Sequence, residues 1–203
     1  MTKRLPHGSA AGPSGPRFEH VKAALQGGTS CRDRTIEFIN KLLSAEAPTM
    51  PEMIASRLVA LQKHKRGIRP IAVGEVWMRF CSICALALCL EAGLDLASLP
   101  LGVSVAGGAQ CIGHALRAGA EAHPDHVTVA TDVRNACNSM PRSAVLQAVA
   151  ERYPQLFPFV NWAYTPAAEL WVHGGPNGHE RLWSTTRVRQ GDPMGPMLSL
   201  IHI

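Results

Sequence analysis

The stretch VTVATDVRNACNSMP, residues 127–141, decides the expected architecture. Its first five residues are β-branched or apolar, a pattern that predicts a buried strand, and the strand ends on a single acid, Asp132. The asparagines, serine and proline that follow break the strand pattern, and a helix is expected over residues 143–153. Enzymes with mixed helices and sheets expose metal ligands in this way at the end of a strand. Asp132 as the cap of a turn is the other interpretation, and this stretch alone leaves both open.

The distribution of charge along the 203 residues indicates a polyanionic partner. Residues 1–79 carry 13 Lys and Arg against 6 Asp and Glu, whereas residues 80–203 carry 7 against 9. A basic first part leading into a slightly acidic body favours nucleic acid as the partner, and ordinary solubility charge is the alternative. With 46% hydrophobic and 17% charged residues, the chain has enough apolar side chains for a core, which excludes broad disorder.

The cysteines and the start of the chain bear on the compartment. Six cysteines are scattered without a disulfide framework, and the first fifteen residues lack the apolar centre of a signal peptide. Cys81 and Cys84 form a CxxC pair inside FCSICALALCL, where we expect reduced core residues in preference to a zinc site, because no second pair of ligands has the right spacing. That apolar run is too short to span a bilayer. We therefore expect an intracellular protein with no membrane partner and no disulfide partner.

The first part of the chain is expected to be mainly helical, with one basic hairpin. Residues 1–15 are rich in Gly, Pro, Ser and Ala and are expected to form a flexible arm. Helices are predicted over residues 18–25, 32–45 and 75–92. Between the second and third, two short strands over residues 58–61 and 68–73 flank a turn at Gly67. Four cations crowd this turn and are suited to contacting phosphates, although a solvated turn is the alternative: Lys63, Lys65, Arg66 and Arg69.

The remaining elements complete an α+β pattern. A helix is predicted over residues 109–122, before the strand that ends on Asp132. Two further helices are expected over residues 143–153 and 155–164, the first with Leu146, Val149 and Ala150 on one face. Two strands over residues 169–173 and 181–188 are joined by GGPNG, and a final helix starts near Met197. The fold class is therefore predicted to be α+β.

Three blocks in this order resemble a known enzyme family. RPIAV (69–73), DVRNA (132–136) and QGDPMGP (190–196) resemble the motifs of reverse transcriptases, the RNA-directed DNA polymerases, of non-LTR and related retrotransposon type. The resemblance extends over roughly residues 12–200. It implies a helical fingers region with the basic β-hairpin (16–125), followed by a partial palm (126–203). The palm would be an incomplete antiparallel sheet packed by helices.

The resemblance also assigns roles to individual positions. Asp132 matches the first metal-binding aspartate of the palm, and the backbone carbonyl of Val133 would contact the same metal. Lys63 and Arg69 match cations that close on the incoming triphosphate, and Gln190 and Gly191 match residues that contact nucleotide and template. Lys65 and Arg66 are expected to bind nucleic acid. The implied chemistry is nucleotidyl transfer with two Mg²⁺ ions, an RNA template, a DNA primer and dNTPs.

Two departures from the family lead to further expectations. Cys137 stands where the family has an aromatic ring that excludes ribonucleotides, so we expect weaker exclusion. The family's later pair of adjacent aspartates is absent, since the only aspartate after Asp132 is Asp192, inside QGDP. One carboxylate binds two Mg²⁺ ions weakly at most, so this 203-residue chain is expected to be an inactive, truncated product. The alternatives are a non-catalytic nucleic-acid-binding module that keeps the basic fingers, and a plain α+β structural domain.

Overall fold

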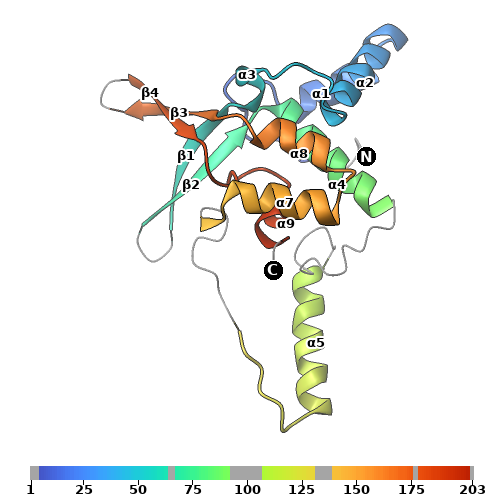
Figure 1. Cartoon of the computed structure of the whole chain (residues 1–203), viewed down its shortest axis with the longest axis vertical. Helices are drawn as coiled ribbons and strands as arrows, with labels where there is room; N and C mark the ends of the chain where they lie inside the picture. The colour runs from blue at the N-terminus through green and yellow to red at the C-terminus, as the bar shows by residue number, and fades with distance from the viewer. Residues whose placement is uncertain (1–4, 64–66, 92–106, 131–138, 176–177, 202–203) are drawn as a thin grey trace.

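A computed structural model describes residues 5–63, 67–91, 107–130, 139–175 and 178–201. Helices and strands alternate along the chain and are labelled in Figure 1. In order, they are α1 (Phe18–Gln26), α2 (Thr29–Leu43), α3 (Pro51–Ile54), β1 (Ser56–Gln62), β2 (Ile68–Gly74), α4 (Val76–Glu91), α5 (Gly108–Ala122), α7 (Arg142–Arg152), α8 (Phe157–Tyr164), β3 (Ala168–Gly175), β4 (Gly178–Ser184) and α9 (Gly195–Leu200). The expectation of an α+β fold is confirmed at this level.

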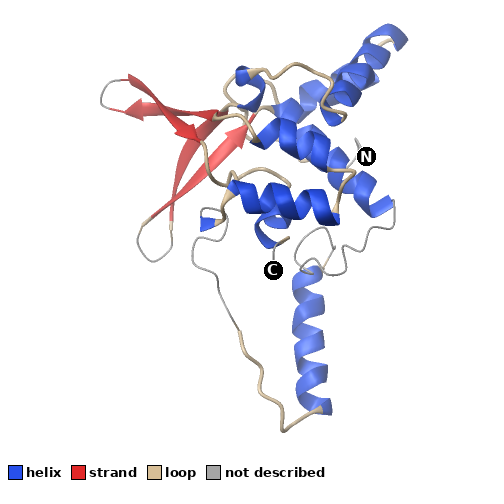
Figure 2. Ribbon diagram, viewed as in Figure 1, coloured by secondary structure: helices blue, strands red, loops and turns tan. Residues whose placement is uncertain are grey.

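The four strands form one mixed sheet in the order β2-β1-β3-β4. β1 pairs with β2 and β3 pairs with β4 as antiparallel hairpins, but β1 and β3 run parallel, with Ser56 opposite Leu170 and Leu58 opposite Val172. The expectation of an antiparallel sheet is therefore wrong at the central pair. A parallel pair needs a long crossover connection, and the helices between β2 and β3 lie in that connection. Figure 2 shows the strands extending away from the helical body.

A single cluster of buried side chains joins the helices. Phe18 and Val21 of α1 and Leu42 of α2 pack with Val76 and Cys81 of α4 in this cluster. The same cluster includes, from the later part of the chain, Val149 of α7, Phe159 and Val160 of α8, and Met197 and Leu198 of α9. The Trp162 indole nitrogen also donates to the Ala47 carbonyl at 2.8 Å, which joins α8 to the loop after α2. Residues from the ranges assigned to fingers and to palm thus share one core and one sheet.

Most of the helices and the basic hairpin agree with the sequence-based predictions. The helical periodicity placed α1, α2, α4, α7 and α8 within a few residues of their observed bounds, and the hairpin of β1 and β2 is confirmed. The buried face of α7 differs from the predicted one: Val145, Ala148 and Val149 are buried, whereas Ala150 is exposed. The helix is covered on the side that faces α8 and α9. Which of its faces is buried therefore depends on the neighbouring helices and not on its own sequence.

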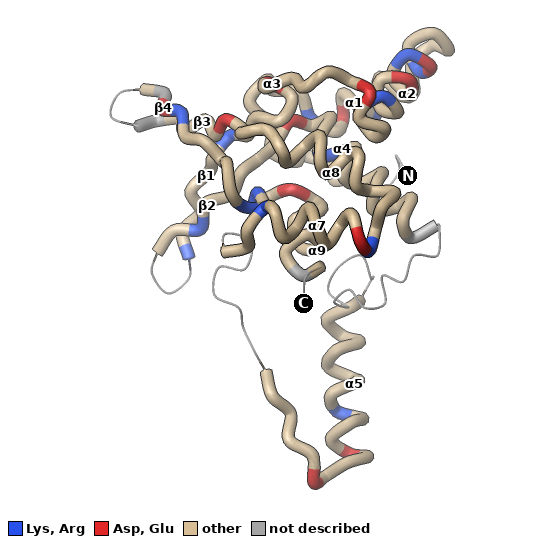
Figure 3. The backbone as a smooth tube through the Cα atoms, viewed as in Figure 1, with Lys and Arg blue, Asp and Glu red and all other residues tan. Residues whose placement is uncertain are grey.

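The predicted strand before Asp132 is the main correction. Residues 127–130 are extended but belong to no strand, and the side chains of Val127 and Val129 are 85% and 78% exposed. A β-branched run forms a strand only where a neighbouring strand accepts its hydrogen bonds, and none of the four described strands lies beside it. The preceding helix α5 is exposed along its length except at Gly108. Figure 3 shows α5 projecting from the body with few charged residues.

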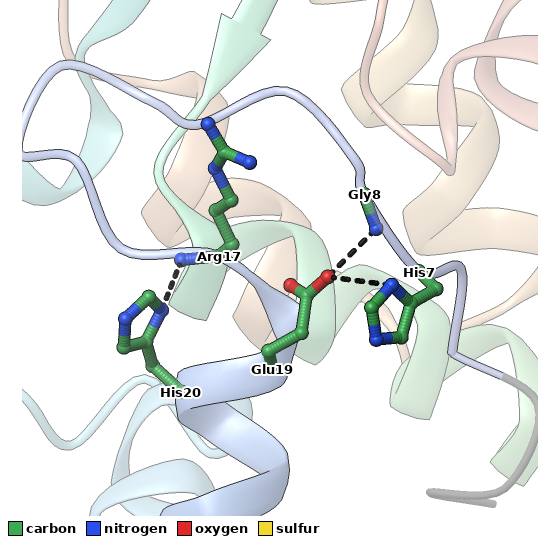
Figure 4. Close-up of polar contacts among 5 residues, drawn as sticks. All are labelled: His7, Gly8, Arg17, Glu19 and His20. Atoms are coloured by element: carbon green, nitrogen blue, oxygen red, sulfur yellow. Dashed lines mark hydrogen bonds and ion pairs between the residues drawn. The ribbon is translucent and has the colours of Figure 1, made fainter.

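The segment before α1 is attached to the body by polar contacts. Figure 4 shows Glu19 of α1 accepting a hydrogen bond from the Gly8 backbone at 2.7 Å, with the His7 ring 3.5 Å away. The hydrogen bond from the Gly8 N–H is the largest of the effects that lower the pKa of Glu19. Further along, Ser14 donates to Glu75 through its backbone at 2.7 Å and through its hydroxyl at 2.6 Å. Residues 8–14, part of the segment predicted as a flexible arm, therefore line the body in this structure.

Candidate nucleic-acid interface

Five of the predicted site residues lie outside the described parts of the chain. Asp132, Val133 and Cys137 fall in residues 131–138, and Lys65 and Arg66 fall in residues 64–66. The metal ligand, the ribonucleotide discrimination and part of the basic turn therefore stay predictions. The four other predicted residues, at positions 63, 69, 190 and 191, have described positions.

The two described cations of the basic hairpin lie at its outer end. The Lys63 backbone donates to the Gly67 carbonyl at 2.9 Å, which extends the ladder by one pair beyond β1. Leu61 lies opposite Arg69 in the register, and since side chains alternate along a strand, Lys63 and Arg69 are on the same face of the sheet. Both are exposed, and neither forms an ion pair with another residue of the described ranges. Such unpaired cations are available to phosphates.

Gln190 and Gly191 lie against the outer edge of β2, 118 residues away in the chain from Ala72. The Ala72 N–H donates to the Gln190 carbonyl at 2.7 Å. Gly191 has a φ of +123°, and a Cβ placed there would overlap the Ala72 carbonyl oxygen and lie 3.1 Å from the Ile71 side chain. Only glycine fits this close approach without strain. The contact brings two of the three sequence blocks, RPIAV and QGDPMGP, together and covers the edge of the sheet.

A buried network holds the segment around Gln190 in place. The Arg189 guanidinium donates to the Ile54 carbonyl at 2.8 Å and to the Ala163 carbonyl at 3.2 Å. It also lies over the Tyr164 ring, 4.4 Å from the centroid. The Tyr164 hydroxyl donates to Asp192 Oδ2 at 2.7 Å, and burial raises the pKa of this tyrosine.

Asp192 therefore has a structural role in this arrangement. Its second oxygen, Oδ1, accepts a hydrogen bond from the Met194 backbone at 2.9 Å, so both carboxylate oxygens have partners in the protein. A metal ion would have to compete for these oxygens with the Tyr164 hydroxyl and the Met194 N–H. Asp132, which lies outside the described residues, stays the predicted Mg²⁺ ligand.

Arg142 joins the end of the central block to the segment before Gln190. Its backbone N–H donates to the Thr186 carbonyl at 2.8 Å. Its guanidinium donates to the carbonyls of Ser184 at 3.2 Å, Arg187 at 2.9 Å and Pro166 at 3.3 Å, and to the Ser184 hydroxyl at 3.1 Å. Burial, with a smaller effect from Arg189, lowers the pKa of Arg142 to about 10. Arg142, six residues after the DVRNA block, is thus attached to the segment that precedes RQGDP.

Sequence reasoning missed Arg142, Tyr164 and Arg189. Nothing in RVRQ indicates that Arg189 is buried and Arg187 exposed. The two arginines are two positions apart, so an alternating pattern would place both on the same side of the chain. A partial signal existed for Arg142, which follows Pro141 at the start of α7. An exposed arginine does not stabilise the start of a helix, so its presence there indicates another role. Their burial depends on the carbonyls that surround them in the folded chain.

The segment 184–190 borders two hollows. One, of about 340 Å³, lies between the sheet and this segment and includes Leu58, Pro70, Leu170 and Gln190 in its lining. The other, of about 460 Å³, lies between residues 139–143 and residues 185–187. By register, Arg69 projects from the sheet face opposite to that of Pro70 and Ala72, so the hairpin cations do not line the hollow that contains Gln190.

Cysteine, histidine and acidic side chains are the other possible metal ligands of the chain. No group of three or more His, Cys, Asp or Glu with metal-binding geometry occurs among the residues that the structure describes. Cys81 is buried in α4, where burial raises the pKa of its thiol, and burial raises the pKa of Cys84 to about 11. None of the five described cysteines forms a disulfide. Within the same ranges, no helix combines the length and the apolar character needed to cross a bilayer.

Comparison with known proteins provides no relative: the chain matches no protein-family model and no curated protein.

Proposed function

We propose that these residues form the fingers and part of the palm of an RNA-directed DNA polymerase of the retrotransposon type. One observation supports this most directly: the RPIAV strand and the RQGDP segment, far apart in sequence, are joined by the Ala72–Gln190 hydrogen bond and the tight contact of Gly191. Motifs that act on one nucleotide must converge in space. The basic hairpin adds exposed cations of the kind that contact phosphates.

The proposed chemistry assigns a limited role to the described residues. Mg²⁺, when bound, would stabilise charge on the transferring phosphoryl group, and Asp132 is the residue of this chain proposed to bind it. Lys63 and Arg69 would neutralise phosphates of the nucleotide or the template. Asp192 would keep the Gln190 segment in position through Tyr164 and Met194.

Binding of primer–template tests the nucleic-acid part of the proposal. Fluorescence anisotropy with a labelled RNA–DNA heteroduplex would be measured over a salt series. The double variant Lys63→Ala with Arg69→Ala is expected to lower the affinity and to reduce the salt slope by about two, because each lost phosphate contact lowers the slope by about one. The control replaces two exposed cations of the helices, Lys22→Ala with Arg34→Ala. Equal losses in both double variants would contradict a specific role for the hairpin.

The catalytic part needs a separate readout. Thermal stability would be compared with and without Mg²⁺ and dNTP in the presence of primer–template. A stabilisation that Asp132→Asn abolishes and Asp125→Asn preserves is expected, since Asp125 is an exposed acid outside the motif. Primer extension by the 203-residue chain is expected to be undetectable. Robust DNA synthesis would refute the expected inactivity.

The alternative is a nucleic-acid-binding module without catalysis. The unpaired, exposed cations of the hairpin favour it as much as they favour the enzyme fragment. Salt-dependent binding of the heteroduplex, together with an absence of any Asp132-dependent effect of Mg²⁺ and dNTP, would support this alternative.

A further inference from the structure

The two hollows along segment 184–190 share residues and lack acids. Thr185, Thr186 and Arg187 line both, so both hollows border the same three residues. Among the described residues that line either hollow, none is an aspartate or a glutamate. Hydroxyl groups and arginines provide the polar lining, which is rich in hydrogen-bond donors and positive charge. Such a lining suits an anionic ligand with several acceptor oxygens.

A hollow on the opposite face of the sheet has acids in its lining. This hollow, of about 360 Å³, is lined by Glu52, Glu75 and Glu169 together with Trp171. Glutamates at that hollow repel a polyanion, whereas the hollows along segment 184–190 do not. Charge therefore distinguishes the hollows rather than the whole faces, since by register Arg57, Arg69 and Arg181 lie on the same face as Glu169. It favours a polyanion at the hollows along segment 184–190.

The segment that borders both hollows is held from behind. The Arg142 guanidinium binds the carbonyls of Ser184 and Arg187, and Arg189 binds carbonyls of α8 and of the residue that ends α3. The Arg142 contacts use the carbonyls of the segment and the Ser184 hydroxyl, and the other contacts use the Arg189 side chain. The side chains of Thr185, Thr186 and Arg187 take no part in them and are exposed. A site held in this way loses little conformational freedom when a ligand binds.

We propose that segment 184–190 binds one single strand of nucleic acid on this face of the sheet. The Arg187 guanidinium and the hydroxyls of Thr185 and Thr186 donate to phosphate oxygens. Bases lie against the apolar surface of Leu58, Pro70 and Leu170, since base faces pack on apolar side chains independently of sequence. The proposal rests on the proposed function only in that the chain binds nucleic acid, and it adds a strand path separate from the basic hairpin.

Arg187→Ala is the decisive variant. Its guanidinium has no hydrogen bond or ion pair with another described residue, and the Arg142 contact uses the Arg187 carbonyl, which the substitution keeps. The matched control is Arg34→Ala, which removes one exposed arginine from α2. The probe is a labelled twelve-nucleotide oligouridylate, measured by anisotropy over a salt series, with thermal unfolding as the check on folding. We expect Arg187→Ala to weaken binding three- to tenfold and to lower the salt slope by about 0.7, the value for one contact with single-stranded nucleic acid, and Arg34→Ala to change neither.

Cross-linking locates the strand independently of affinity. An oligonucleotide containing 4-thiouridine is irradiated in the complex, and the protein is digested with trypsin, which releases residues 182–187 as one peptide. We expect the cross-link on this peptide, and Thr185→Val with Thr186→Val to reduce its yield. Equal affinities of Arg187→Ala and Arg34→Ala, or a cross-link found only elsewhere, would overturn the proposal.

The outcomes separate this proposal from the proposed function. If the hairpin variants lose heteroduplex binding while Arg187→Ala binds the oligouridylate normally, the strand path is wrong and the polymerase-fragment proposal stands. If Arg187→Ala loses binding while the hairpin variants do not, the strand path stands and the assigned role of the fingers cations fails. If wild-type protein binds neither probe, both proposals fail.

Discussion

Replacing Gly191 with alanine is expected to detach the RQGDP segment from the edge of β2. The φ of +123° at this position is one that residues with a Cβ rarely adopt. The added methyl group would also overlap the Ala72 carbonyl oxygen and lie 3.1 Å from the Ala72 carbonyl carbon. Both contacts are to backbone atoms, so neither can be relieved by rotating a flexible side chain. The segment has to move away from β2.

The expected magnitude combines two effects. A residue with a Cβ in such a backbone conformation costs about 1 to 3 kcal/mol. Moving the segment breaks the hydrogen bond from Ala72 to Gln190, which contributes about 1 kcal/mol. The free energy of unfolding should therefore fall by about 2 to 4 kcal/mol. For a chain of this size, each kcal/mol corresponds to about 2 to 4 °C, so the Tm should fall by about 4 to 16 °C.

Thermal and urea unfolding would measure the change, with Gly15→Ala as the control. Gly15 also has a positive φ, of +97°, but a Cβ there meets nothing within 4 Å. The control thus carries the conformational strain without the overlap. If Gly191→Ala destabilises the protein no more than Gly15→Ala does, the close approach of residue 191 to β2 is incorrect. Loss of heteroduplex affinity in Gly191→Ala, at a temperature where it stays folded, is also expected.

The remaining predictions concern buried charges and thiols. Arg142→Ala should lower the free energy of unfolding by about 2 to 4 kcal/mol in urea unfolding, because buried carbonyls lose their donors. Arg142→Lys should recover only part of this loss, and unchanged stability of both variants would refute the network. Asp192→Ala should lower the free energy of unfolding by about 1 to 2 kcal/mol and should keep the stabilisation by Mg²⁺. Unchanged stability together with loss of the Mg²⁺ effect would instead identify Asp192 as a metal ligand. At pH 8, iodoacetamide should modify the exposed Cys31 far faster than Cys84. With the pKa of Cys84 raised to about 11, only about one molecule in a thousand carries the reactive thiolate there. Peptide mass spectrometry would measure the two modification rates, and equal rates at Cys31 and Cys84 would contradict the prediction.

Local sequence patterns predicted individual elements well. The apolar spacing of Ile39 and Leu42 corresponds to the buried face of α2, and the run from Phe159 to Trp162 corresponds to the buried part of α8. The hairpin of β1 and β2 followed from two apolar runs around Gly67. These predictions succeed because helical periodicity and turn residues act over a few positions.

The candidate site was only partly predictable. Gln190 and Gly191 were identified by the resemblance of their block to a family motif. Their contact with Ala72 brings this block next to the RPIAV block. The buried partners Arg142, Tyr164 and Arg189 were missed, because each is satisfied by main-chain carbonyls or by a side chain distant in sequence. The strand before Asp132 failed as a prediction since β-branched residues favour a strand but do not supply its neighbour.

The sequence by itself determined where most of the described helices and the hairpin of β1 and β2 lie, because their signals depend on neighbours within about one turn of chain. Only the tertiary structure decided that β1 and β3 pair in parallel, that Gly191 lies against the edge of β2 and that Arg142 and Arg189 are buried. Those features depend on contacts between residues that are far apart in the chain. Burial of a charge, or pairing of a strand, is favourable only when a distant segment supplies the matching carbonyls or N–H groups.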